Sequence, residues 1–363
     1  MKNLRKKIFI WSPMLSNVGT NTAMYGIAES LKRYSNCEVY YLDILGEFSD
    51  FKEDGKSHLK FLKINHLVPN TGKFSKFIII FFSILSLPFL IMQIFLKKPD
   101  TIITGFVGFV PSIAKIFFPK LKIINSIQGY PKLNFLRKII WKIFYVNSDY
   151  IITMTNKTKR LLQEKLSISE HKILVIENPV ISRKIRKLAN SEIDDKDKII
   201  FKKDVYCSIG RLTRQKNFFE LLNFIKDYEN KNTNFIIIGS GEQKNKIKEF
   251  IKKNKIDNCY LLGFKKNPYN YLSRSKLYIS TSLWEEPGHT LLEAGYLNIP
   301  ILSSNCPNGP DEIIQNKFNG LKYTLGNKTD FINKLKDFKE LSDFKKKEIT
   351  INMKKNVINY TQF

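Results

Sequence analysis

Arginine, histidine and cysteine are scarce in this sequence. Nine of the 60 basic residues are arginines, and histidine and cysteine occur four times each. Bidentate recognition of phosphates and bases favours arginine, and no motif alternates aromatic and basic residues for base stacking, so a nucleic-acid partner is not expected. The cysteines have no metal-ligand spacing and each lies beside an apolar run, which predicts buried free thiols in a reducing compartment: Cys37, Cys207, Cys259 and Cys306.

Acidic residues are also few, and the formal net charge is +27. Two interpretations stay open: compositional drift alone, or drift that is also used at an anionic membrane surface. The basic start of the chain is followed by only a short apolar run, 8–11, before polar residues return. A signal peptide needs a longer apolar region, so we expect a first strand and a cytoplasmic protein.

A length of 363 residues suits two domains. Short β-rich runs alternate with helical stretches in both halves, which predicts an α/β protein with two Rossmann-like, doubly wound domains that face a cleft. Ligands bind such sheets at the carboxyl ends of the strands. We expect a first domain over 1–178, a polar linker over 179–203, a second domain over 204–340 and a C-terminal helix over 341–363.

The segment 77–96 is almost wholly apolar, and Lys73, Lys76, Lys97 and Lys98 flank it. It is long enough to span a bilayer, but a spanning helix would put strands of one sheet on opposite sides of the membrane. The remaining interpretations are a helix buried against its own sheet, or a helix that also inserts an exposed face into the membrane surface. We expect docking of this second kind, with lysines drawn to anionic lipid.

Two cations follow a strand in the second half of the chain. The segment 208–222 predicts a strand, a tight turn at Gly210, then Arg211 and Lys216, then a helix. Cations at the start of a helix form an anion site, although the same pattern also fits a solvated surface loop. Further strands end at Gly239 and Gly241 and at Gly263, where the backbone turns tightly or something packs closely on it.

The segment 280–314 carries two carboxylates eight residues apart. Glu285 precedes a helix that Pro287 and Gly288 introduce, and Glu293 lies on that helix. One carboxylate can bind sugar hydroxyls, the helix amides can hold phosphate, and the other carboxylate can bind ribose hydroxyls. The glutamates could instead be solvated charges, but the flanking runs 291–292 and 299–302 are apolar, and a carboxylate beside a buried segment needs a partner.

From Val205 to Leu321 the sequence resembles the retaining family 4 glycosyltransferases of the GT-B superfamily. The resemblance rests on GRLTRQKN, GSGE, LLGF, EEPGHTLLE and IPILSSNCPNGPDEI, and it extends more loosely through IFIWSPMLSNVGTNTAMYGIAESL and VIENPV. It implies the GT-B fold, with an N-terminal acceptor-binding domain and a C-terminal domain that binds the nucleotide sugar.

The resemblance also implies residue roles. Arg211 and Lys216 would bind the donor diphosphate and stabilise it as leaving group, Glu285 would hold the transferred sugar, and Glu293 the ribose. Arg211, Lys216 and Glu285 are therefore the catalytic candidates. The other expected donor-binding residues are glycines close to the diphosphate, residues at the helix start and residues of the base pocket: Gly19, Gly210, Gly239, Gly241, Gly288, His289, Thr290, Gly263 and Phe264.

The sequence departs from the family where many members have a histidine in the first domain. Gln128 stands there, and we take it as a candidate on the acceptor side. His58, His66 and His171 do not match the position and are expected in loops or at the surface. The acidic run 194–197 lies in the expected linker and is predicted to be solvated, so no metal site is expected, and the basic pair would do the work of a cation.

The resemblance implies transfer of a hexose or N-acetylhexosamine from a nucleotide sugar, most simply a UDP-sugar. The expected acceptor is a glycan on a lipid diphosphate, in assembly of surface polysaccharide such as O-antigen, by a protein peripheral to the inner face of the cell membrane. Two alternatives stay open: a soluble acceptor, or a non-catalytic, membrane-associated subunit with the same fold. The presence of Arg211, Lys216, Glu285 and Glu293 argues against the last.

Overall fold

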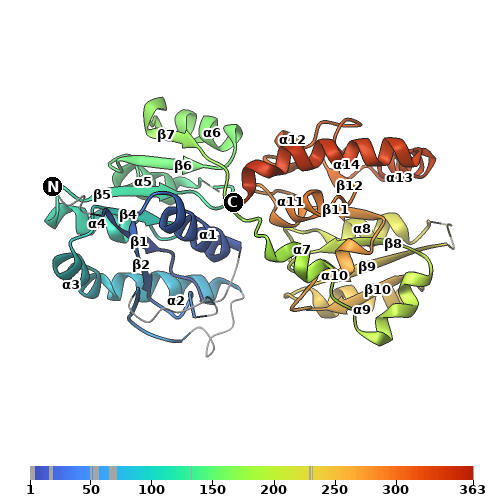
Figure 1. Ribbon diagram of the computed structural model, residues 1–363, viewed down its shortest axis with the longest axis horizontal. Helices are drawn as coiled ribbons and strands as arrows, with labels where there is room; N and C mark the ends of the chain where they lie inside the picture. Colours follow the sequence, from blue (N-terminus) through green and yellow to red (C-terminus); the bar gives the residue numbers. More distant parts are fainter. Residues whose placement is uncertain are drawn as a thin grey trace. The chain divides into compact units, whose positions relative to one another are not determined.

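The computed structural model describes residues 5–15, 19–49, 51, 57–64, 72–131, 133–228, 230 and 232–362. The chain divides into two compact units. Unit 1 comprises Met1–Val180 with Gln362–Phe363, and unit 2 comprises Ile181–Thr361. Each unit is a parallel sheet covered by helices (Figure 1).

Unit 1 contains a seven-stranded sheet in the order β3-β2-β1-β4-β5-β6-β7. Its strands are β1 (Lys7–Trp11), β2 (Glu38–Asp43), β3 (His58–Lys60), β4 (Thr101–Thr104), β5 (Lys122–Ser126), β6 (Tyr150–Thr153) and β7 (Ile173–Val175). Its helices are α1 (Gly19–Tyr34), α2 (Gly72–Leu85), α3 (Leu87–Lys97), α4 (Phe109–Phe117), α5 (Phe135–Phe144) and α6 (Asn156–Leu166).

Alternation along β1 shows why helices cover both faces of this sheet. Phe9 and Trp11 lie on one face and pack with buried residues of α2, α3 and α4. Ile8 and Ile10 lie on the other face with residues of α1. Because successive side chains of a strand point to opposite faces, a strand that is apolar throughout needs cover on both sides.

Unit 2 contains a six-stranded sheet in the order β10-β9-β8-β11-β12-β13. Its strands are β8 (Asp204–Ile209), β9 (Thr233–Ile238), β10 (Cys259–Gly263), β11 (Leu277–Ser280), β12 (Ile301–Ser304) and β13 (Leu321–Tyr323). Its helices are α7 (Lys184–Ala189), α8 (Phe218–Ile225), α9 (Lys244–Lys253), α10 (Tyr269–Ser273), α11 (His289–Tyr296), α12 (Gly309–Ile313), α13 (Lys328–Glu340) and α14 (Asp343–Val357). The strand order reverses at β8, and a sheet of this kind binds ligands at that point.

The segment expected as a linker, 179–203, is not a separate connection. From Ile181 onward it belongs to unit 2 and forms α7 and a 3-10 helix, Asp195–Lys202. Asp197 is buried, accepts a hydrogen bond from the Tyr271 hydroxyl at 2.7 Å and pairs with Lys265 at 2.7 Å. The prediction of a solvated acidic run is therefore wrong at Asp197, because partners about 70 residues away compensate its burial.

The apolar segment 77–96 forms two helices rather than one. Helices α2 and α3 meet at an angle of 47°, and in the part of the chain that the structure describes no single helix is long and apolar enough to cross a membrane, although this bent pair has the length and composition to do so. Pro88 lies in the first turn of α3 and has no N–H to continue α2. Ile79, Leu90 and Ile94 pack on the sheet, whereas Phe74, Phe77 and Phe81 are exposed.

The cysteines and histidines lie only partly where the sequence predicts. Cys207, Cys259 and Cys306 are buried free thiols as predicted, while Cys37 is only partly buried. His58 is buried on β3 with its ring 4.8 Å from that of Tyr41, so its expected loop or surface position is wrong. His171 is exposed in a 3-10 helix, and His66 lies outside the described residues.

Candidate functional site

The loops that follow β8 and β11 are joined to each other. The two strands are parallel neighbours, so both loops leave the same edge of the sheet. The backbone N–H of Leu283 donates to the carbonyl of Gln215 at 2.8 Å, and the Gln215 side chain donates to the carbonyl of Trp284 at 3.0 Å. These bonds hold the two loops in register and place Lys216 beside Glu285.

Lys216 and Glu285 form a desolvated ion pair. Their side chains are only 17% and 7% exposed. The Ser282 hydroxyl donates a second hydrogen bond to the same carboxylate oxygen at 2.5 Å. An anion that enters this site meets an ammonium group that is already largely shielded from water, which strengthens the electrostatic attraction. Arg211, at the start of the same loop, is exposed.

The N-terminus of α11 follows Glu285 closely in the chain. Gly288 precedes the helix with φ +100°, a conformation that favours glycine. The first helical hydrogen bond runs from the N–H of Leu291 to the carbonyl of Gly288 at 3.0 Å. The amides of His289 and Thr290 therefore come before the hydrogen-bonded part of the helix, where an anion binds favourably.

His289 does not add a positive charge to the site near neutral pH. Burial, with a further contribution from Lys216, lowers the pKa of its imidazole to about 4. The positive charge that the structure places beside Glu285 is therefore that of Lys216, and the role of Arg211 stays a prediction. A neutral imidazole can still donate or accept a hydrogen bond with a sugar hydroxyl.

Glu293 lies on α11 and is bound by a residue that the sequence did not indicate. The hydroxyl of Tyr269, from α10, donates to the Glu293 carboxylate at 2.9 Å. Burial raises the pKa of this carboxyl to about 7, although the Tyr269 bond and Lys216 act in the opposite direction. A carboxylate of this kind keeps acceptor capacity for a pair of ligand hydroxyls.

Several glycines hold the loops together by close packing. A Cβ on Gly239, which has φ +151°, would lie 1.9 Å from the carbonyl oxygen of Gly210, and one on Gly241 would lie 2.5 Å from that of Leu212. Gly309 was missed in the sequence: its Cβ would lie 1.7 Å from the carbonyl oxygen of Pro287. The Asn-Gly-Pro segment 308–310 is the only local signal that could have indicated this approach.

Other expected donor-binding residues lie on elements that do not carry the ion pair. Gly263 ends β10, the edge strand, with φ +72°, and the Phe264 side chain is 76% exposed. Gly19 begins α1 in unit 1. The structure places these residues at the ends of strands or helices, and their roles toward the base and the phosphate stay predictions.

Gln128 lines a cavity of about 350 Å³ that lies wholly within unit 1. The Gln128 amide donates to the Ser126 hydroxyl at 2.6 Å, and its carbonyl accepts from Asn178 at 2.7 Å. Ile80 of α2 and Trp141 of α5 form part of the apolar wall. The cavity lies at the carboxyl ends of β4 and β5, a position where a Rossmann-like unit receives ligands.

The second half of the chain matches a known protein family. Residues 190–358 match the family model of glycosyl transferases group 1. An uncharacterized glycosyltransferase of Methanocaldococcus jannaschii is 35% identical over 253 residues, which are 64% of this chain and 62% of the relative. An Escherichia coli enzyme, UDP-Gal:alpha-D-GlcNAc-diphosphoundecaprenol alpha-1,3-galactosyltransferase, is 31% identical over 231 residues, 59% of each chain. The matched segments thus span about six tenths of these relatives.

The solved structures give the fold of the whole chain. Anabaena HepE in complex with UDP superposes with a TM-score of 0.77 at 15% identity, over 98% of this chain and 96% of that one. Likeness at this level of identity establishes architecture alone. The chain has the GT-B fold, and its residues 190–358 match the glycosyl transferases group 1 family.

Proposed function

We propose that this protein is a retaining glycosyltransferase that moves a hexose or N-acetylhexosamine from a UDP-sugar to a glycan on a lipid diphosphate, in surface polysaccharide biosynthesis. The observation that carries the proposal is the buried Lys216–Glu285 pair beside the N-terminus of α11. Within a glycosyltransferase domain, this arrangement puts a cation, a carboxylate and helix amides at one end of the sheet.

The proposed chemistry follows from these groups. Lys216 and Arg211 neutralise the diphosphate as the glycosidic bond breaks and negative charge builds on the leaving group. Glu285, released from Lys216 by the incoming phosphate, accepts hydrogen bonds from the transferred sugar. The acceptor hydroxyl attacks from the side that the diphosphate leaves, so the departing phosphate oxygen takes the proton and the anomeric configuration is kept.

The lipid-linked acceptor is supported by the relatives and by unit 1. The Escherichia coli relative acts on a sugar diphosphoundecaprenol. Helix α2 exposes Phe74, Phe77 and Phe81, and exposed apolar patches of this kind indicate an interaction surface. An acceptor carried by a lipid diphosphate lies at the bilayer surface, so a protein that uses it gains from binding the anionic membrane.

A panel of nucleotide sugars tests the donor. Purified full-length protein is expected to hydrolyse a UDP-sugar slowly without acceptor, and to prefer it over the GDP- and ADP-sugars. Because Lys216 and Arg211 supply the positive charge, the rate should persist in EDTA. Release of nucleotide diphosphate by each donor, with and without EDTA, is the measurement. A requirement for a divalent cation would contradict the assignment of the basic pair.

The raised pKa of Glu293 predicts a pH dependence of donor binding. Burial places this pKa at about 7, and the carboxylate is a better acceptor for ribose hydroxyls than the neutral acid. Affinity for a nucleotide sugar is therefore expected to rise by up to roughly tenfold between pH 6 and pH 8, as the ionised fraction increases. Titration calorimetry measures this, and Glu293→Gln should remove the dependence.

Ionisation of Glu293 affects the stability of the fold in the direction opposite to its effect on donor binding. A folded-state pKa above the ordinary value of 4.5 favours the protonated folded form. The resulting contribution to the free energy of unfolding is fully present below pH 4.5 and is lost as the pH rises through about 7. A binding profile that is flat in pH for the wild-type protein would contradict the proposed contact between Glu293 and ribose.

A further inference from the structure

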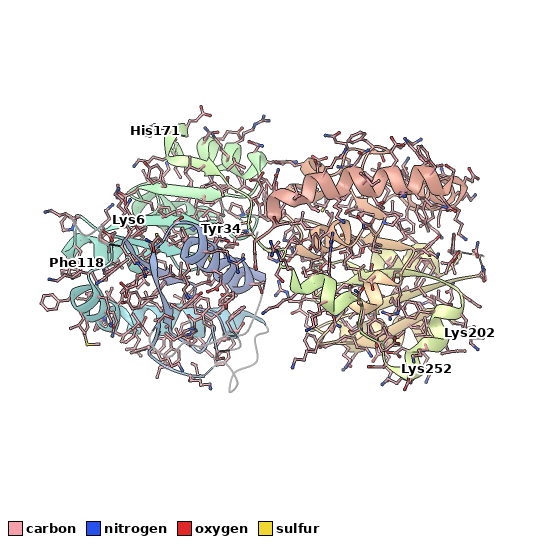
Figure 2. All side chains as sticks on the ribbon, in the orientation of Figure 1. Lys6, Tyr34, Phe118, His171, Lys202 and Lys252 are labelled. Atoms are coloured by element: carbon pink, nitrogen blue, oxygen red, sulfur yellow. The ribbon has the colours of Figure 1, made fainter. Side chains whose placement is uncertain are left out.

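A second cavity of unit 1 lies away from the carboxyl ends of the strands. It has a volume of about 660 Å³ and lies between the C-terminal ends of α3 and α4, beside the starts of β4 and β5. We call it the α3–α4 pocket. Figure 2 labels Lys6 and Phe118, two of its lining residues, at the same end of unit 1.

Lysines surround the pocket. Lys6, Lys98, Lys120 and Lys122 line it, and all four are exposed. Asp100 is the acidic member of the lining, and one of its carboxylate oxygens already accepts a hydrogen bond from the backbone N–H of Lys7 at 2.8 Å. The local field is therefore strongly positive, and it favours an anionic ligand.

The walls of the same pocket are apolar. Phe95 at the end of α3 and Phe117 at the end of α4 line it while their side chains stay 69% and 63% exposed, and Leu121 and Ile94 are buried beneath. Ile116, next to Phe117, is 73% exposed. A free phosphate ion would use the lysines and leave these rings in water. An amphiphile with an anionic head and an acyl chain contacts both the lysines and the rings. The volume of the pocket lies in the range of ligand-binding cavities.

The exposed apolar residues continue onto the neighbouring helices. Helix α3 contacts α2 on one side and α4 on the other, and α4 contacts α5. Each of these helices exposes large apolar side chains, for example Phe77 on α2, Leu96 on α3 and Ile143 on α5. Unit 1 thus presents apolar groups on four neighbouring helices around a pocket that is ringed by lysines.

We propose that the α3–α4 pocket binds an anionic phospholipid of the bilayer, with the headgroup between Lys98 and Lys120 and an acyl chain against Phe95 and Phe117. This deepens the membrane association proposed above and rests on that part of it, but not on the transfer reaction. It places a lipid contact at the opposite ends of the strands from the cavity that Gln128 lines. The lipid bound here is a membrane component and not the acceptor.

Vesicle binding tests the pocket with variants of equal charge. Lys98→Gln/Lys120→Gln removes two pocket lysines, and Lys252→Gln/Lys253→Gln removes two exposed lysines of α9 in unit 2. Full-length protein is sedimented with phosphatidylcholine vesicles that do or do not contain phosphatidylglycerol. The pocket variant is expected to lose roughly tenfold to thirtyfold in affinity for the anionic vesicles, and the α9 variant less than about threefold. Equal losses in both variants would show attraction by net charge and overturn the proposal.

Two further measurements distinguish a phospholipid in the pocket from membrane contact elsewhere on unit 1 and from a free anion. A phosphatidylglycerol with a photoreactive acyl chain should label peptides that contain Phe95 or Phe117, and labelling confined to α2 or to residues 126–141 would overturn the proposal. Glycerol phosphate alone should not displace the vesicles, because it lacks the acyl chain. Displacement at low concentration would indicate a site for free anions and would also overturn the proposal.

Other variants distinguish this proposal from the proposed function. Phe74→Ser/Phe77→Ser/Phe81→Ser should weaken binding to all vesicles through α2, without changing the preference for phosphatidylglycerol. The pocket variant should hydrolyse a nucleotide sugar at the wild-type rate, because its residues lie in unit 1 outside the donor site. A pocket variant that has lost hydrolysis together with lipid binding would reveal a general structural defect and contradict the proposal. Wild-type protein that binds anionic lipid through the pocket but transfers no sugar would count against the proposed reaction alone.

Discussion

Replacement of Lys216 or of Arg211 by alanine is expected to lower the turnover of the nucleotide sugar by roughly tenfold to a few hundredfold. Each side chain would make a charge-assisted contact with the departing diphosphate, and that contact strengthens as negative charge develops. Steady-state kinetics on the two single variants measure the effect. Arg214→Ala is the matched control, because Arg214 is an exposed arginine of the same loop.

The two variants should differ in stability. Arg211 is exposed, so its removal should leave the free energy of unfolding nearly unchanged. Loss of Lys216 leaves the buried Glu285 carboxylate without its ammonium partner, which costs about 3 kcal/mol or more. The double variant Lys216→Ala/Glu285→Gln should recover part of that stability and none of the turnover. Unchanged kinetics in both single variants, with the protein folded, would end the assignment of the basic pair.

Glu285→Gln should chiefly lower kcat, by roughly a hundredfold, because a charge-assisted hydrogen bond of about 3 kcal/mol is lost when the glycosidic bond breaks. Its effect on the binding of free UDP should be small. Glu293→Gln should show the opposite pattern and weaken both free UDP and the UDP-sugar, since ribose is common to both.

These two glutamates serve as controls for each other. They lie eight residues apart beside the same helix, and either substitution replaces a carboxylate by an amide of nearly equal volume. Kinetics and titration of UDP on both variants would separate the roles. Wild-type affinity of Glu293→Gln for UDP would show that the ribose contact is wrong, and an unchanged kcat of Glu285→Gln would do the same for the sugar contact.

The sequence predicted the α/β architecture and the candidates Lys216 and Glu285, whereas it did not indicate Tyr269 or Gly309 as part of the site. Strands such as β8 and β9 are mostly apolar, as parallel strands buried on both faces are, and α8 between them has an apolar face. Arg211 and Lys216 stood out because they follow a strand and precede a helix, and Glu285 because it precedes a helix that carries a second carboxylate. The pairing of Lys216 with Glu285, 69 residues apart, depends on β11 lying beside β8, which local patterns do not reveal.

Other features depend on contacts that only the folded chain makes. Tyr269 has no neighbour in the sequence that links it to Glu293, and it reaches that carboxylate from a short helix. The apolar run 77–96 shows no periodicity that separates the buried Ile79 from the exposed Phe81, so neither the bend nor the exposed face could be assigned. The segment 181–203 has weak periodicity because it forms short helical pieces, and its long-range partners hold it on unit 2.

The most direct test of the proposed function is transfer of one labelled sugar. Full-length protein is incubated with a UDP-hexose or UDP-N-acetylhexosamine and a synthetic N-acetylglucosaminyl diphospholipid in anionic vesicles, and the product is analysed by mass spectrometry and proton NMR. We expect one sugar to be added with the anomeric configuration of the donor, and no product from Lys216→Ala above background. A product of inverted configuration, or equal transfer to N-acetylglucosamine without the diphospholipid, would contradict the proposal.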